Sequence, residues 1–214
     1  MIGVETEKSR STTRAQAIAR LAVFCVLALT LGPAQGFASA FGFKVGMTRD
    51  QIVAIVGSKA LDRTDGDVLT FSTAPEPHGK FVQYMCIISP DAGLLKVAAY
   101  SRDITTNAFG DNLKEQFEEL EKGVASVYGD GERMDFLMSG SLWSGPRDWM
   151  MGLLKEERTL ATYWKPNPSP DKITIVVLKA TALSTEKGYI SLVYEFEGFH
   201  AYTEKKKQNQ NAVF

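Results

Sequence analysis

The segment between Gly110 and Gly129 constrains the fold of this chain more than any other, because its apolar residues recur at the spacing of a helix. The residues of this apolar stripe are Leu113, Phe117, Leu120, Val124 and Val127. The opposite side is charged, and such a helix is stable only when its stripe packs on another layer. Strand-forming runs on both sides of the segment supply that layer. The sequence therefore predicts an α+β fold.

The strand-forming runs are grouped into an earlier and a later set. The earlier set comprises Ala60–Leu61, Val68–Phe71, Phe81–Ile88 and Leu94–Tyr100, and the later set comprises Leu160–Trp164, Ile173–Ala182 and Tyr189–Phe196. In the last run, Ile190, Leu192, Tyr194 and Phe196 alternate with Tyr189, Ser191, Val193 and Glu195. This alternation predicts a strand with Ile190 and its partners facing the core. Short turns between neighbouring runs favour antiparallel meanders.

A short helix is predicted after Thr48. Thr48 and Gln51 have the spacing of a capping box, in which both side chains satisfy free backbone groups at the start of a helix. Ile52, Ile55 and Val56 would form its apolar face, and Gly57 is placed to end it in a left-handed conformation.

The order of helix and meander occurs twice, which suggests two units after a leader. We predict helix-plus-meander units over residues 41–108 and 109–202. They are either a true duplication, with separate sheets or one shared sheet, or parts of a single α+β domain. The sequence leaves both interpretations open. Within the second unit, Met134–Met138 is expected to form a helical turn and Pro146 to start a helix. Residues 203–214 contain three consecutive lysines and an Asn/Gln run, and are predicted to be a disordered tail.

The run Gly46–Ile52 followed by Gly57 resembles the helix-opening signature of the BamE (SmpA/OmlA) family of envelope proteins. Two helix-plus-meander units in tandem are similar to the β-lactamase inhibitor protein architecture. The resemblance covers about residues 45–100. It implies an exported, non-catalytic α+β scaffold that binds other proteins.

The first forty residues have the zones of a secretory signal peptide. Its basic residues are Lys8, Arg10, Arg14 and Arg20. The apolar run Leu21–Gly32 would span about 18 Å as a helix, less than the roughly 30 Å of a membrane core. Ala38 and Ala40 supply the small residues of a cleavage site. We therefore predict a signal peptide over 1–40, cleavage after Ala40, a periplasmic or secreted protein, and no stable membrane anchor after cleavage.

Composition excludes several classes of function. The formal net charge is -1, whereas a nucleic-acid-binding protein carries a basic surplus, so no nucleic-acid partner is expected. With 2 cysteines and 2 histidines, neither a metal site nor a disulfide framework is expected, and no sequence motif indicates a cofactor. Cleavage would leave Cys86 as the sole cysteine, in an apolar stretch where a buried side chain is expected.

Catalytic patterns are weak in this sequence. His78 and His200 are isolated, and no nucleophile and base are visible together. Ser184 and Lys187 have S-x-x-K spacing, but they fall between two strands, which favours a hairpin turn. The acidic residues of the predicted amphipathic helix, Glu118, Glu119 and Glu121, are interpreted as a solvated face. An enzyme is therefore the less favoured interpretation.

Four clustered aromatic residues, Trp143, Trp149, Tyr163 and Trp164, are candidate binding residues, with core packing as the alternative. The leading hypothesis is an exported, non-catalytic protein that acts through contacts with an unidentified protein partner in the bacterial envelope. One alternative is an inhibitor of a secreted hydrolase. Another is an enzyme or small-ligand binder with a pocket between sheet and helices.

Overall fold

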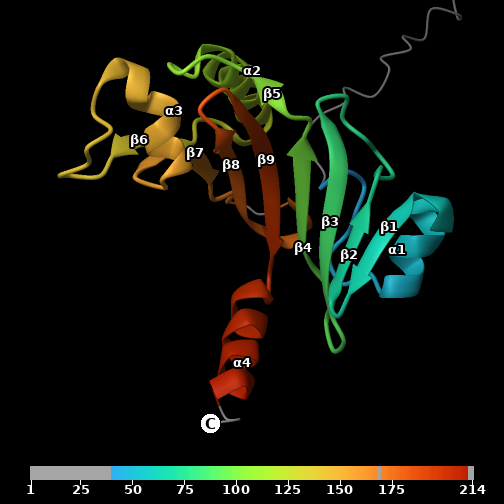
Figure 1. Cartoon of the computed structure of the whole chain (residues 1–214). Coiled ribbons are helices and arrows are strands. Elements are labelled where there is room, and N and C mark those ends of the chain that lie inside the picture. The colour runs from blue at the N-terminus through green and yellow to red at the C-terminus, as the bar shows by residue number, and fades with distance from the viewer. Residues whose placement is uncertain (1–39, 168–169, 212–214) are drawn as a thin grey trace, which may run out of the picture. The chain divides into compact units, whose positions relative to one another are not determined.

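A computed structural model describes residues 40–167 and 170–211 of the chain (Figure 1). Within these residues, nine strands form one antiparallel sheet in the order β1-β2-β3-β4-β9-β8-β7-β6, and β5 pairs with β9 beside this path. The strands are β1 (Leu61–Asp65), β2 (Val68–Phe71), β3 (Phe81–Ser89), β4 (Gly93–Ser101), β5 (Ile104–Thr105), β6 (Glu132–Leu137), β7 (Arg158–Trp164), β8 (Ile173–Ser184) and β9 (Lys187–Phe196). The predicted α+β class is confirmed.

The two predicted meanders lie side by side in this one sheet. Strands β1 to β4 form the first and β7 to β9 the second, which β6 extends by one strand that was not predicted, and the two meet where β4 pairs with β9. At that junction Ala98 lies opposite Val193 and Ala99 lies opposite Leu192. Backbone hydrogen bonds therefore join each strand to the next across the whole sheet, from β1 to β6.

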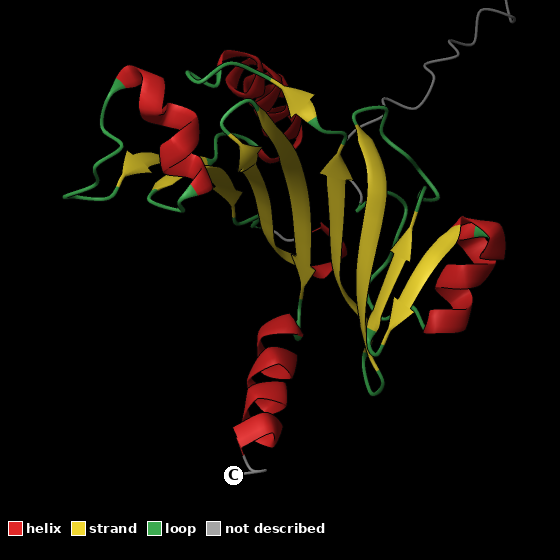
Figure 2. Cartoon of the chain, in the orientation of Figure 1, coloured by secondary structure: helices red, strands yellow, loops and turns green. Residues whose placement is uncertain are grey.

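The helices are coloured red in Figure 2. They are α1 (Arg49–Val56), η1 (Ser58–Ala60), α2 (Asp111–Tyr128), η2 (Pro146–Asp148), α3 (Trp149–Leu154), η3 (Pro170–Lys172) and α4 (Phe199–Asn211). The predicted helix between Gly110 and Gly129 is confirmed as α2, and its stripe is buried except at Val127, which is 37% exposed. Both α2 and α3 contact β8, so they cover the second half of the sheet.

One face of the sheet is buried across all its central strands. Leu192 and Tyr194 of β9 are fully buried, as the predicted alternation requires. The segment before α1 also covers this face, because the ring of Phe41 makes edge contacts with Tyr84 and Tyr194 at centroid distances of 5.1 and 5.6 Å. Aromatic pairs in this geometry add to the free energy of burial.

Helix α1 begins as predicted. The hydroxyl of Thr48 accepts a hydrogen bond from the backbone N–H of Gln51, and the Gln51 side chain accepts one from the backbone of Thr48. Ile52 is fully buried, whereas Ile55 is 46% exposed, so the predicted apolar face is only partly buried. Gly57 ends the helix with φ of 93° and ψ of 136°, a positive φ outside the left-handed helical region.

Two predicted elements need correction. Met134–Met138 is not a helical turn, because residues up to Leu137 belong to β6 and pair with β7. Residues 203–211 of the predicted tail are helical within α4, and ion pairs connect this helix to residues of the first meander. In these pairs, Lys206 lies 3.1 Å from Asp67 and Lys205 lies 3.2 Å from Asp91.

The leader lies outside the described residues up to position 39, and with it Ala38 of the predicted cleavage site. Ala40 is described, buried, and forms an isolated bridge with Phe43. Residues 212–214 also lie outside the described part of the chain.

Candidate binding surface

Two of the four predicted aromatic residues belong to the core. Trp149 and Trp164 are 6% and 2% exposed. Trp149 packs so closely on Gly110 that a β-carbon there would lie 2.3 Å from the indole ring. The indole Nε1 of Trp164 donates a hydrogen bond to the carbonyl of Gly129 at 2.9 Å. These contacts fix α2 and its ends on the sheet, and they leave neither tryptophan available to a partner.

Tyr163 lies on the other face of the sheet. Its neighbour Thr162 is buried and bonded to Glu121 of α2, which places Thr162 on the helix-covered face. Successive residues of a strand point to opposite faces, so half-buried Tyr163 faces away from α2. Trp143 is half-buried in the loop between β6 and η2. The structure therefore does not bring the four aromatic residues together.

Tyr163 ends a row of apolar side chains that crosses five neighbouring strands on the face opposite α2 and α3. Each member lies directly opposite the next in the register of the sheet, in the order Met85, Ala98, Val193, Val177 and Tyr163. The small Ala98 is buried among its neighbours and the other four are half-buried. We call these five residues the apolar row.

Polar and aromatic groups border the apolar row. The rings of Tyr100 and Tyr189 lie 6.1 Å apart beside it, and burial raises the pKa of Tyr100. On its other side Lys96 and Glu195 form an ion pair of 3.0 Å, and Lys96 also lies over the ring of Phe199. An apolar centre with a polar rim is the usual arrangement of a protein-binding surface.

The two edges of the sheet differ in character. Edge strand β1 carries Arg63 and Asp65, which form an exposed ion pair of 2.8 Å. At the opposite edge, Phe136 of β6 is 43% exposed, Met138 is 52% exposed and Leu142 in the following loop is 86% exposed. Charges protect an edge strand from pairing with another chain, whereas apolar residues favour it. We call Phe136, Met138 and Leu142 the β6 apolar patch.

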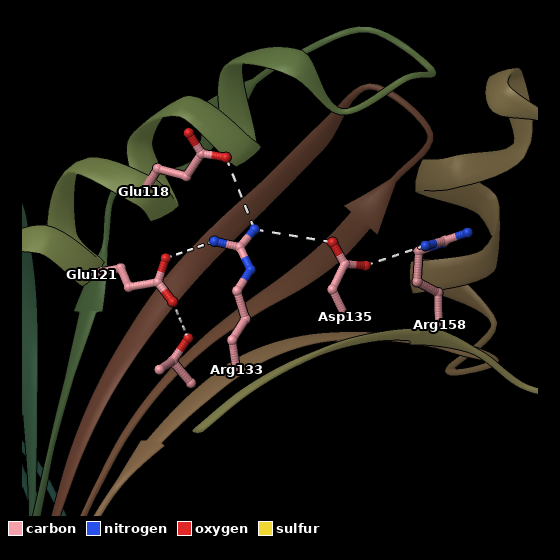
Figure 3. Close-up of polar contacts among 6 residues, drawn as sticks. Glu118, Glu121, Arg133, Asp135 and Arg158 are labelled. Atoms are coloured by element: carbon pink, nitrogen blue, oxygen red, sulfur yellow. Dashed lines mark hydrogen bonds and ion pairs between the residues drawn. The ribbon is translucent and has the colours of Figure 1, made fainter. Parts of the chain in front are cut away.

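A polar network fixes β6 to α2 (Figure 3). Arg133 of β6 lies 2.6 Å from Glu121 and 3.9 Å from Glu118, both of α2. Asp135 of β6 accepts a hydrogen bond of 3.2 Å from Arg158 at the start of β7. The prediction of a solvated acidic face is therefore wrong for Glu121, which is only 19% exposed and also accepts a hydrogen bond from Thr162.

This network shows which side chains of β6 lie on the helix-covered face of the sheet. Arg133 and Asp135 face the helices, so the alternate residues Met134 and Phe136 lie on the face of the sheet opposite α2 and α3, which we call the open face or open side. Lys114 of α2 adds a cation over the ring of Trp149 at 4.3 Å, and burial lowers the pKa of Lys114. Ion pairs this close to solvent add little to stability, so the facing of β6 is set by its pairing with β7.

A cleft of about 550 Å³ lies between α4 and the hairpin that joins β3 to β4. Leu95 and Ala201 line its apolar part, and Asp67, Tyr202 and Lys206 line its polar part. The Tyr202 hydroxyl donates a hydrogen bond of 2.6 Å to Asp67. That bond and the neighbouring Lys206 ammonium lower the pKa of Asp67. The cleft has a volume typical of small-molecule sites.

The structure shows the surroundings of the two histidines and of the S-x-x-K pair. His78 accepts a hydrogen bond at Nδ1 from the backbone of Lys80, and burial lowers the pKa of His78. His200 is exposed on α4. Ser184 and Lys187 pair at the β8–β9 turn, as predicted.

Cys86 is buried as predicted, which raises the pKa of its thiol to about 12. Among the described residues, no group of three or more His, Cys, Asp or Glu side chains is placed to hold a metal ion.

Sequence reasoning missed the apolar row and the β6 apolar patch. Met85, Val177 and Val193 fall in predicted strands, but the face to which each points follows only from the register. For β6, the alternation of Arg133 and Asp135 with Met134 and Phe136 is a strand signal that was present in the sequence.

Together the fold and this surface define an α+β protein with one helix-covered face and, on the other face of its sheet, an apolar row with a polar border. No family model, curated protein or solved structure matches the chain. The resemblance of residues 45–100 to the BamE family therefore stays a prediction. No helix in the described segments has the length and apolar character needed to cross a membrane.

Proposed function

We propose that this chain is an exported, non-catalytic protein that binds a partner protein through the open face of its sheet. The apolar row carries this proposal. Four of its five side chains are half-buried although each points away from α2 and α3. Burying such a surface against a partner would contribute roughly 25 cal/mol for each Å² of apolar area removed from water.

The position of the row suits a protein partner better than a small molecule. Its members come from strands β3, β4, β9, β8 and β7, so the row extends across five hydrogen-bonded strands. Small ligands prefer concave sites, whereas extended apolar rows with aromatic borders are typical of protein interfaces. Tyr163 and Tyr100 are the aromatic side chains best placed to anchor such a partner.

The test is a crosslinking pull-down from the envelope extract of the native cell. The wild-type chain should capture one specific protein, and the Val177→Lys variant should capture at least tenfold less, because a lysine in the middle of the row would have to be desolvated without a counter-ion. Val177 is half-buried on the open face, so the substitution leaves the core intact.

Ile55→Lys is the matched control, because Ile55 is an exposed apolar residue of α1 outside the row. This variant should capture the partner as the wild type does. Recovery of no protein above background, even after crosslinking, would contradict the proposed function. Equal loss of capture in both variants would assign binding to general surface apolarity rather than to the row.

A second candidate function is small-ligand binding in the cleft under α4. The cleft volume of about 550 Å³ and its apolar wall with a few polar groups favour it. Ala201→Trp would fill the cleft from α4. Native mass spectrometry of the purified protein should then show a bound small molecule in the wild type and none in Ala201→Trp; an unliganded wild type would remove this candidate.

A further inference from the structure

The free edge of β6 is defined by its pairing with β7. The backbone N–H of Met138 donates to the carbonyl of Glu157 at 2.8 Å, which continues the register of Leu137 opposite Arg158. In an antiparallel pair, such bonded positions alternate with positions whose backbone groups point away. Arg133, Asp135 and Leu137 therefore direct their N–H and C=O groups towards the open edge. Strand β6 ends the order of the sheet, so no described strand accepts these groups.

The side chains of β6 sort into two sets by face. Arg133 and Asp135 lie on the helix side, where Glu121 and Arg158 engage them. Met134, Phe136 and Met138 therefore share the open side, and the last two are 43% and 52% exposed. A strand that paired with this edge would need apolar side chains at three alternate positions to cover this set.

We propose that β6 is the interface between two copies of this chain, joined edge to edge and antiparallel about a twofold axis at Phe136. In this register Phe136 lies opposite Phe136 of the second copy, and Met134 lies opposite Met138. The residues that form backbone bonds across the interface are Asp135 and Leu137, both of which direct those groups outward. The exposed apolar residues of β6 are thus covered by the same residues of the other copy, which is the self-complementarity that a twofold interface requires.

Other registers also pair the outward-pointing backbone groups of β6 with those of the second copy, but these registers are less favourable. A twofold axis at Asp135 places two carboxylates directly opposite each other, which is destabilising in a sheet. A twofold axis at Met134 places Phe136 opposite the charged Glu132 and leaves Met138 beyond the paired segment. Only the axis at Phe136 matches all three apolar residues of the open side. This dimer uses the edge of the sheet, so it is independent of a partner on the open face.

A cysteine at the axis tests both the interface and its register. In the proposed register Phe136 is a non-hydrogen-bonded pair with its symmetry mate, for which the Cα atoms are about 4.5 Å apart, within the range that a disulfide can bridge. In a Cys25→Ser background, Phe136→Cys should form a disulfide-linked dimer within minutes of mild oxidation. Cys86 is fully buried and does not compete.

Ile55→Cys is the matched control, since Ile55 has 46% exposure against 43% for Phe136. It should remain at least 90% monomeric on a non-reducing gel under the same oxidation. Equal crosslinking of both variants would overturn the proposal, because collision alone would then explain the product. Absence of crosslinking in Phe136→Cys would overturn it as well.

A second measurement does not depend on an introduced cysteine. Light scattering on the purified full chain should give twice the monomer mass at micromolar concentrations, and Phe136→Lys should give the monomer mass, because two ammonium groups would meet at the axis. Circular dichroism would show that Phe136→Lys keeps its sheet, as expected for an exposed position. A wild-type chain that stays monomeric at 100 micromolar would overturn the proposal and leave the pull-down test of the proposed function unaffected.

Discussion

At the scale of single residues, Gly110 shows how one backbone position fixes a helix on the sheet. Its φ of 76° and ψ of 21° lie in the left-handed region, and Trp149 fills the space where a side chain would be. Gly110 thus starts α2 and admits the indole at the same point. All three tryptophans lie between positions 143 and 164, so tryptophan fluorescence reports on this contact and on the second half of the sheet.

We predict that Gly110→Ala destabilises the protein by about 2 to 5 kcal/mol. A left-handed conformation costs an L-residue roughly 1–2 kcal/mol, and overpacking against a fixed ring adds about 1–3 kcal/mol. Urea unfolding followed by fluorescence measures the change. Gly66→Ala is the control, since Gly66 has φ of 55° but no atom within 4 Å of the added carbon. It should cost only the conformational part, and an equal loss in both variants would show that Trp149 yields without strain.

At the scale of elements, α4 depends on charges that lie far away in the sequence. Asp67 accepts hydrogen bonds from Tyr202 and Lys206, and these partners lower its pKa below the ordinary 3.8. A carboxyl whose pKa is lowered in the folded state stabilises that state at higher pH. This stabilisation is lost as pH falls from the ordinary value through the lowered one. The contribution of Asp67 to the docking of α4 should therefore be lost in acid.

We predict that Asp67→Asn reproduces this acid effect at neutral pH. Amide hydrogen exchange in residues 199–207 should become several-fold faster, because the amide cannot pair with the Lys206 ammonium. Exchange in β3 and β4 should stay as in the wild type. Asp65→Asn is the control, because Asp65 pairs with Arg63 in the same turn and not with α4. Unchanged exchange in Asp67→Asn would mean that other contacts hold the helix.

The elements that sequence could predict are those in which local pattern and tertiary packing agree. Helix α2 and strand β9 each bury the face that their period marks, and the structure confirms both. Strand β6 was misassigned because its polar residues Arg133 and Asp135 turn inward to the helices, which inverts the usual pattern. The end of α4 was missed because its ionic partner Asp67 lies 139 residues before Lys206.

The candidate binding surface was least predictable for the same reason. A row that crosses five strands is a property of register, and register depends on hairpin lengths and bulges throughout the sheet. Clustering in sequence selected Trp149 and Trp164, which the fold buries. Of the four aromatic candidates, only Tyr163 belongs to the apolar row.

At the scale of the whole molecule, the pairing of β4 with β9 couples the two meanders. Val97 and Leu192, one from each meander, are fully buried in one hydrophobic core. Phe41 also contacts Tyr84 of the first meander and Tyr194 of the second. Opening this junction would expose fully buried side chains on both sides. Unfolding of one meander should therefore remove the support of the other.

We predict that both meanders unfold in a single transition, and the chain contains a separate probe for each. Tryptophan fluorescence reports on the second meander, because all three tryptophans lie in or beside it. Cys86 reports on the first: it is fully buried in β3, and burial raises the pKa of its thiol to about 12, so a thiol reagent reaches it only after unfolding. In a Cys25→Ser background, the urea midpoints of fluorescence and of Cys86 labelling should coincide, as two-state unfolding requires.

Leu192→Ala at the junction should lower both midpoints together, at a cost of about 2–5 kcal/mol. Labelling of Cys86 at a clearly lower urea concentration than the fluorescence change would show that the meanders unfold separately, and the coupling through β4 and β9 would then be wrong.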